Sequence, residues 1–242
     1  MNDFKSGFVY LLSGFTLILK PKVRFYSLTP LFLNILLFLL LFFYSYSKLD
    51  EIISVLELQW QWLGWVSWII WVIFFIAISI LIFFCFSILG NLISAPFNNL
   101  LSRAVELELL GKNIDIIVEQ SMQELIIDSF KSEYRKIIYF FLRILILLSL
   151  FFIPVVNIIT PFIWFIFSIW MFAIEYCDFP MSNHNIQFSR QLMILSKKRF
   201  LVCGFGLGVL TFILLPIINL IIIPVSVAGA TKMYIESIKS EL

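Results

Sequence analysis

The segment EYCDFPMSNH, at residues 175–184, gathers side chains that could bind a metal ion or move a proton. It holds Cys177, Asp178 and the only histidine of the chain, His184. His184 alone cannot make a zinc site, which needs three or four ligands, although these three residues together could in principle share one ion. Nothing in the sequence places a nucleophile near His184, so a catalytic triad is not supported. We therefore expect no metal, no cofactor and no enzymatic activity.

A turn explains the same segment more simply. Uncharged stretches of more than 30 residues precede and follow the polar part of the chain around it. Pro180 interrupts the hydrogen bonds of a helix, and Asp178 and Asn183 have side chains that bond to the free backbone groups of a turn. We interpret Asp178, Pro180, Asn183 and His184 as a structural turn.

The composition of the chain shows which environment must position these residues. Of the 242 residues, 62% are apolar and 13% are charged, whereas soluble domains carry about 25% charged residues. The mean hydropathy is +1.04. The chain is therefore predicted to be an all-α integral membrane protein in contact with a lipid bilayer. Its net charge of +2 is too small to suggest nucleic-acid binding, and it has no GxxxxGK[ST] loop for ATP.

Two uncharged runs are long enough for transmembrane helices. Residues 25–47 provide a first span, since a bilayer core needs about 20 helical residues. Residues 58–102 would extend over roughly 67 Å as one helix, so we expect a second, long helix that leaves the membrane or bends near Pro96.

Two later uncharged runs, residues 144–174 and 200–231, are each interrupted by proline. Proline removes a backbone donor and clashes with the preceding turn, so each run should split into two legs. The central prolines and the nearby asparagines are Pro154 and Asn157 in the first run and Pro216 and Asn219 in the second. We predict two re-entrant helical hairpins whose turns line a pore. The alternative is two ordinary pairs of proline-kinked spans without a role in transport.

The polar segments predict the orientation of the chain. Lysine and arginine number four in residues 1–24, six in 103–143 and four in 175–199, whereas the loop 48–57 has one lysine and three acids. Basic segments favour the cytoplasm, so we expect these three segments and the tail 232–242 inside, with both termini, and the loop 48–57 outside.

The first two of these basic segments, 1–24 and 103–143, should be helical. In 103–143, Gly111 is a plausible stop for a first helix, and a capping box from Ser121 to Glu124 should begin a second one that continues into the apolar run. Residues 1–24 are predicted to form an interfacial helix, or a helix that packs on its neighbours through its glycine side.

A basic edge, LKPKVRFYSLTP, comes directly before the first span. It contains Lys20, Lys22 and Arg24. Two interpretations are open. The cations could anchor the chain at lipid headgroups, or they could form an anion site at a helix start, where backbone N–H groups and the helix dipole favour negative charge.

Several of these segments resemble one family, the CysZ-type sulfate permeases of bacterial inner membranes. The resemblance covers roughly residues 5–236, and it is specific in NLISAPFNNLLSRAVE, EYCDFPMSNHNIQF and LPIINLIIIPVSVAGAT. It implies uptake of sulfate for cysteine biosynthesis. It also implies two long membrane helices, two pairs of helices that only half penetrate the bilayer, and packing as oligomers.

The same resemblance assigns sulfate to the turn before the first span. The family tends to carry Pro-Gly-Leu-Arg-Arg there, which becomes Pro21-Lys22-Val23-Arg24-Phe25 in this chain. The first arginine is retained as Arg24, Lys22 replaces the glycine and Phe25 replaces the second arginine. The resemblance thus implies sulfate binding at Lys22, Val23 and Arg24. Lysine directs fewer backbone N–H groups at an anion than glycine does, although it adds a charge.

These observations lead to one interpretation and one rival. We predict a single membrane domain that assembles as a homo-oligomer and acts as an inner-membrane sulfate permease. Its expected partners are sulfate and lipid. The rival is a membrane scaffold or regulatory protein that transports nothing.

Overall fold

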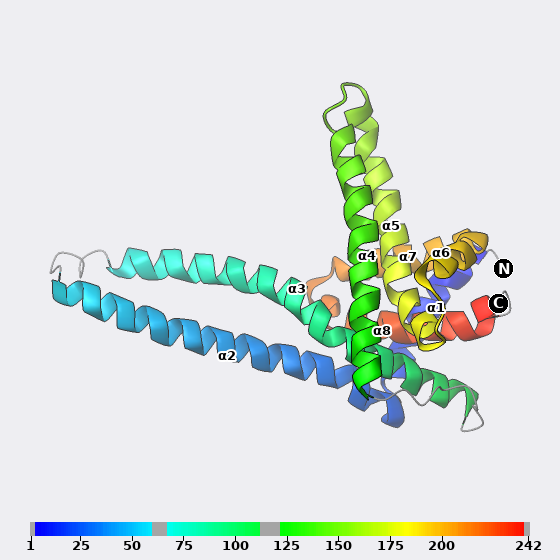
Figure 1. Cartoon of the computed structure of the whole chain (residues 1–242), viewed down its shortest axis with the longest axis horizontal. Helices are drawn as coiled ribbons and strands as arrows, with labels where there is room; N and C mark the ends of the chain where they lie inside the picture. Colours follow the sequence, from blue (N-terminus) through cyan, green and yellow to red (C-terminus); the bar gives the residue numbers. More distant parts are fainter. Residues whose placement is uncertain (1–2, 60–66, 112–121, 240–242) are drawn as a thin grey trace. The chain divides into compact units, whose positions relative to one another are not determined.

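The computed structural model describes residues 3–59, 67–111 and 122–239. In chain order its helices are α1 (Asp3–Ile18), α2 (Pro21–Gln59), α3 (Ser67–Leu110), α4 (Met122–Leu150), α5 (Val156–Asn183), α6 (Phe188–Lys197), α7 (Arg199–Ile213), α8 (Pro216–Met233) and a π-helical turn, η2 (Tyr234–Ile238) (Figure 1). Within these residues there is no strand, so the prediction of an all-α fold is confirmed there.

The chain divides into two compact units. The first comprises Met1–Leu28 and Ala95–Leu242, and the second comprises Thr29–Ser94. Each of the two longest helices, α2 and α3, contributes residues to both units.

In the second unit, segments of α2 and α3 contact each other through aromatic side chains. The rings of Tyr46 on α2 and Trp71 on α3 lie 5.2 Å apart, beside an apolar cavity of about 360 Å³. The expectation of a loop at residues 48–57 is wrong, because α2 continues through this segment to Gln59. The Lys48 ammonium lies 2.6 Å from the Glu51 carboxylate, a pairing that helical spacing brings together on one face.

The first unit is built around α1, which packs against α7 and α8. Two glycines allow this close approach: a Cβ at Gly7 would overlap the carbonyl oxygen of Leu201, and a Cβ at Gly204 would overlap that of Phe4. Gly204 is therefore a point of close contact between α7 and α1. Residues 3–18 form a helix packed on its neighbours through its glycine side, the second of the two possibilities left open by the sequence.

Helices α4 and α5 form a hairpin and run side by side (Figure 1). Helix α4 ends at Leu150, and α5 begins at Val156. Pro154 lies in the turn, and Val155 there has a φ of 71°, which is unusual for a β-branched residue. The predicted break near Pro154 is confirmed.

The far end of α5 differs from the prediction. The helix passes through Pro180 and ends only at Asn183, so the interpretation of Asp178 and Pro180 as turn residues is wrong. Proline lacks the N–H that would bond to the carbonyl of Tyr176, but the buried contacts of this helix end, where Asp178 is 1% exposed, hold it helical. The turn lies one step later, with His184 as the residue that caps the helix.

The second hairpin breaks where the sequence predicts. Helix α7 ends at Ile213, and Pro216 is the first residue of α8. Proline suits this position because its φ is helical and its missing N–H would have no partner in the helix. Pro161 and Pro224, the second prolines of the two runs, lie inside α5 and α8.

The polar helical pair forms as expected where it is described. Helix α3 ends at Leu110, and Gly111 follows with a φ of 77°, the left-handed conformation that glycine adopts without a steric cost. Helix α4 continues from Met122 into the apolar run. The predicted capping box starts at Ser121, which lies outside the described residues.

Within the described residues, two helical stretches are long and apolar enough to cross a membrane by length and composition: Val156–Asn183 and Ile221–Ile238.

Candidate functional site

The turn between α1 and α2 carries the predicted anion site. Pro21 is the first residue of α2. The backbone amides of Val23 and Arg24 each donate to the carbonyl of Lys20 at 2.9 Å. These two amides are therefore already bonded at the start of the helix.

The side chains of this turn divide into one anchor and two cations. Val23 is fully buried, whereas Lys22 and Arg24 are exposed. Neither cation has an ion-pair partner in the part of the chain that the structure describes. The turn thus offers two positive charges to solvent at the N-terminus of a helix, where the helix dipole adds to their attraction for an anion.

An ion pair joins this turn to the end of α3. The Lys20 ammonium lies 3.2 Å from Oε1 of Glu108. Both side chains are partly exposed, so the pair contributes little to stability. It does show that the cationic turn lies beside the C-terminal turns of α3.

Helix α3 carries a stripe of buried polar side chains near that end. Asn98, Ser102 and Glu106 recur every four residues and are 5%, 0% and 2% exposed. This spacing puts them on one face of the helix. In a chain as apolar as this one, a buried polar stripe is costly unless each group has a partner or water.

The stripe contacts α8 through Ser102. The hydroxyl of Thr231 donates to the carbonyl of Val227 at 2.7 Å, so the hydroxyl of Ser102 is the donor in the 2.9 Å contact between the two side chains. Oδ1 of Asn98 and Oγ of Ser226 are buried and have no hydrogen-bond partner among the described residues. Unpaired polar atoms of this kind are where ordered water is found in proteins.

Two residues of the EYCDFPMSNH segment bond to α3 at the C-terminal end of the stripe. Nε2 of His184 lies 2.8 Å from Oε1 of Glu106, and its ring lies 5.2 Å from that of Tyr234. Asn183 accepts from Nε of Arg103 at 3.2 Å. Asn183 and His184 do lie at a turn, as predicted, but both side chains bond to α3.

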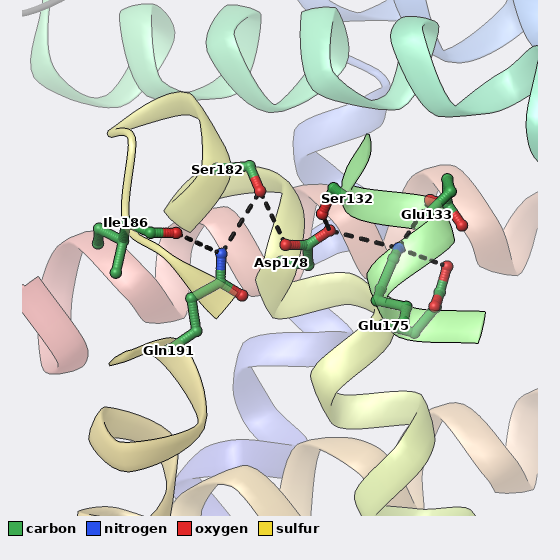
Figure 2. Close-up of polar contacts among 8 residues, drawn as sticks. Ser132, Glu133, Glu175, Asp178, Ser182, Ile186 and Gln191 are labelled. Atoms are coloured by element: carbon green, nitrogen blue, oxygen red, sulfur yellow. Dashed lines mark hydrogen bonds and ion pairs between the residues drawn. The ribbon is translucent and has the colours of Figure 1, made fainter. Parts of the chain in front are cut away.

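A buried ion cluster joins α4 to α5 beside this turn. Lys136 is 1% exposed, and its ammonium lies 2.7 Å from Glu133, 3.0 Å from Glu175 and 3.4 Å from Asp178. Figure 2 shows the three carboxylates converging from the two helices. Hydroxyls of Ser132 and Ser182 donate to the two oxygens of Asp178 at 2.6 and 2.7 Å.

The electrostatics of the cluster favour a bound proton. Burial would lower the pKa of Lys136, but the carboxylates of Glu175, Asp178 and Glu133 raise it above its usual value. Burial raises the pKa of the Glu133 carboxyl to about 7, against the opposing effect of Lys136. One cation among three carboxylates leaves excess negative charge, which protonation of Glu133 relieves near neutral pH.

The predicted pore residues lie apart from this network. Asn157 is exposed in the first turn of α5, where its backbone N–H donates to the carbonyl of Ile153 at 3.1 Å. Pro154 lies in the adjacent turn, and Pro216 begins α8. Asn219 belongs to α8, and its side chain lies outside the described set.

Sequence reasoning missed Glu106 and Lys136 because it counted them only as charges of the polar segment 103–143. It missed Asn98 and Ser102 because they are neutral residues of the uncharged run 58–102. A signal was present. Asn98, Ser102 and Glu106 repeat at the helical spacing of four, and Glu133 precedes Lys136 by three. The partners across helices, Glu175 and Asp178, could not be read from spacing.

Comparisons with known proteins agree over almost the whole chain. The model of the family described as "Sulfate transporter CysZ/Etoposide-induced protein 2.4" matches residues 10–224. Among similar curated proteins, one from Pseudomonas paraeruginosa is 36% identical over 234 residues, which cover 95% of this chain and 94% of the relative. One from Vibrio parahaemolyticus is 36% identical over 248 residues, with 99% and 98% covered. One from Pectobacterium atrosepticum is 34% identical, with 96% and 85% covered. All three are named sulfate transporter CysZ.

Proposed function

Because the chain belongs to the family of the sulfate transporter CysZ and etoposide-induced protein 2.4, we propose that it is a permease that carries sulfate across a membrane. The family is one of transporters, and the chain is not an enzyme. The cargo is a dianion that passes unchanged and supplies sulfur for cysteine biosynthesis.

The observation that carries the proposal is the pairing of an exposed cationic turn with a buried polar stripe. Lys22 and Arg24 stand at the start of α2, and the Lys20–Glu108 contact shows that their turn lies beside the end of α3. The stripe on α3 then continues through Ser102 to Asn98, away from that end. Capture at the surface and passage along polar groups are the two things that a sulfate path needs.

Each part has a separate task in the proposed path. The guanidinium of Arg24 binds an oxyanion through a planar pair of donors, and Lys22 adds a second charge. Val23 anchors the turn by its buried side chain. Removing water from a dianion is very costly, so water held at the lone pairs of the Ser102–Thr231 pair and at the unpaired atoms of Asn98 and Ser226 replaces part of the hydration shell.

Both hairpins are proposed to be re-entrant, with Pro154 and Asn157 at the tip of one and Pro216 and Asn219 at the tip of the other. Helices α7 and α8 have 15 and 18 residues, or roughly 22 and 27 Å, less than the hydrocarbon core of about 30 Å. In α4, 14 residues separate Lys136 from the end of the helix at Leu150, roughly 21 Å. The ion cluster thus stays at the side from which the hairpin enters.

The proposed location is the bacterial inner membrane, with both termini in the cytoplasm and the protein assembled as a homo-oligomer. The distribution of lysine and arginine supports this orientation. Cysteine labels test it in a background whose native cysteines are replaced by alanine. A label at exposed Ser189 should react only after the membrane is permeabilised, and one at exposed Lys48 should react before. A label at Ser189 that reacts from outside contradicts the orientation.

Flux of labelled sulfate into proteoliposomes tests the proposed activity. Uptake should exceed that of empty vesicles and should fall when unlabelled sulfate competes. Thr231→Val keeps the shape of the side chain but removes the hydroxyl that accepts from Ser102, so flux should fall at least about fivefold, as expected for the loss of one hydrogen-bonding group in a desolvated path. Thr211→Val, on an exposed face of α7, is the matched control. A folded protein without flux would leave only the scaffold alternative.

A further inference from the structure

A polar pocket of about 190 Å³ lies between α4, the end of α5 and the start of α6. Its volume is that of roughly six water molecules in the liquid. It shares no residue with the cationic turn at α2 or with the α3 stripe, so the proposed sulfate path makes no use of it. Its lining divides into a cationic rim and a floor of hydrogen-bond acceptors.

The rim carries positive charge from one helix. Lys131 and Arg135 both line the pocket and are exposed. They are four residues apart on α4, so they lie one turn above each other on the same face. Within the described part of the chain Arg135 has no ion-pair partner. Two adjacent cations, one of them a guanidinium, suit a phosphate or a similar oxyanion.

The start of α6 adds to this potential. Gln187 and Phe188 line the pocket, and α6, of ten residues, begins there with no side-chain cap from the residues that the structure describes. The free N–H groups of an uncapped first turn and the helix dipole favour an anion at this place.

The floor has the opposite character. The hydroxyls of Ser132 and Ser182 donate to Asp178, so each has lone pairs rather than a proton for further contacts. Oγ of Ser182 also accepts from Nε2 of Gln191 at 3.4 Å. Gln191, which is 1% exposed, donates through Nε2 to the carbonyl of Ile186 at 2.9 Å. Its Oε1 is buried in the wall and has no hydrogen-bond partner in the described part of the chain. Figure 2 shows Gln191, Ser182 and Asp178 in this arrangement.

The floor also lies against the ion cluster. Lys136 compensates part of the charge of Glu133, Glu175 and Asp178, but the cluster retains excess negative charge when all three acids are ionised. A simple anion would be attracted at the rim and repelled at the floor. A ligand with an anionic group at one end and an N–H-bearing cation at the other matches both.

We propose that this pocket binds phosphoethanolamine, with its phosphate at Arg135 and Lys131 and its primary ammonium on the floor formed by Ser132, Ser182 and Gln191. The favoured source is the headgroup of phosphatidylethanolamine. The apolar stretch Val156–Asn183 ends beside the pocket, and the place where a membrane-embedded helix leaves the bilayer lies at the depth of the headgroups. The proposal does not require sulfate to be the cargo.

Binding of soluble probes tests the chemistry. Line broadening in ³¹P NMR spectra, measured with the whole chain in a phosphate-free detergent, compares phosphoethanolamine with phosphocholine. The two have similar charges, but the quaternary ammonium of phosphocholine has no N–H to donate. Phosphoethanolamine should bind at least about tenfold more tightly, as expected for charged hydrogen bonds. Equal binding of the two probes, or no binding of either, overturns the proposal.

Matched variants locate the site. Arg135→Gln should weaken phosphoethanolamine binding at least about tenfold, whereas Lys197→Gln, an exposed cation in the last turn of α6, should leave it unchanged. Arg24→Ala should also leave it unchanged, so failure here and failure of the sulfate proposal are separate results. Binding that survives Arg135→Gln would place the ligand elsewhere and contradict the assignment.

Nanodiscs distinguish the two sources of the ligand. If the lipid headgroup is the ligand, the thermal midpoint should be higher in nanodiscs that contain phosphatidylethanolamine than in pure phosphatidylcholine, and Arg135→Gln should abolish the difference. The same midpoint in both lipids, together with binding of the soluble probe, would overturn the lipid source and support free phosphoethanolamine instead.

Discussion

Nε2 of His184 lies 2.8 Å from Oε1 of Glu106, and this contact joins the end of α5 to the buried stripe of α3. The glutamate is 2% exposed, and the imidazole packs beside the ring of Tyr234. The single histidine of the chain therefore acts between helices rather than in solvent. It holds in place the end of the stripe that lies nearest to the cationic turn.

Removal of the Glu106 carboxylate should destabilise the protein. Glu106→Ala leaves His184 without its partner in a buried position, at a cost of about 1–3 kcal/mol. Glu106→Gln keeps an acceptor at the same place and should cost less. The thermal midpoint of the purified protein measures both, with exposed Glu236→Ala as the control. If Glu106→Ala melts with the control, the contact does not stabilise the fold.

Stability should depend on pH through Glu133. Its pKa rises from 4.5 to about 7 in the folded protein because burial disfavours the charged form. The fold therefore binds a proton that the unfolded chain releases, and this contribution is complete below about pH 4.5 and lost as the pH rises through about 7. At 1.36 kcal/mol for each pKa unit, the contribution is at most about 3 kcal/mol.

The variant Glu133→Gln isolates this effect. The amide stays neutral at every pH and can still accept from Lys136, so the decline of the thermal midpoint between pH 5 and pH 8 should become shallower than in the wild type. Glu236→Gln, at an exposed site, should retain the wild-type slope. An unchanged slope in Glu133→Gln would mean that the carboxyl is already ionised at pH 5.

The sequence predicts the helical breaks well because proline and glycine act locally. Pro154 and Pro216 fall at the two hairpin turns, and Gly111 follows the last residue of α3. Pro180 shows the limit of the same rule. Its position in a helix depends on the buried contacts of Asp178 with Ser132 and Ser182. Ser182 is near Asp178 in the sequence, but Ser132 belongs to a different helix, so the sequence around Pro180 does not reveal this contact.

The candidate site shows the same division. The cationic turn was predicted because its residues are consecutive and stand before an uncharged run. The stripe on α3 and the cluster around Lys136 were missed because their roles depend on burial. A count of charged residues in the sequence does not show which side chains are buried. Lys136 reads as one more basic residue in the sequence, but in the structure it is 1% exposed and faces three carboxylates.

Close packing of α1 on α7 should tolerate no added methyl group. A Cβ at position 204 would overlap the carbonyl oxygen of Phe4, so Gly204→Ala should force the two backbones apart and cost about 1–3 kcal/mol. Thr16→Ala, on the exposed side of α1, is the control. Thermal midpoints of the two variants in one detergent make the comparison. A Gly204→Ala protein as stable as the control would show that the helices can separate without cost.

Arg24 should matter more than any other cation of its turn. It is exposed on the first turn of α2, and its guanidinium stays charged and offers a planar pair of donors to sulfate. A charged hydrogen bond of this kind contributes about 1.5–3 kcal/mol, so Arg24→Ala should weaken sulfate binding and uptake at least about tenfold. Arg24→Lys should restore only part, because it returns the charge without the fork. Binding in detergent and flux in vesicles, at matched protein levels, measure the effect, with exposed Lys5→Ala as the control. Normal transport by Arg24→Ala would make this turn an anchor and would shift the anion site to the stripe on α3.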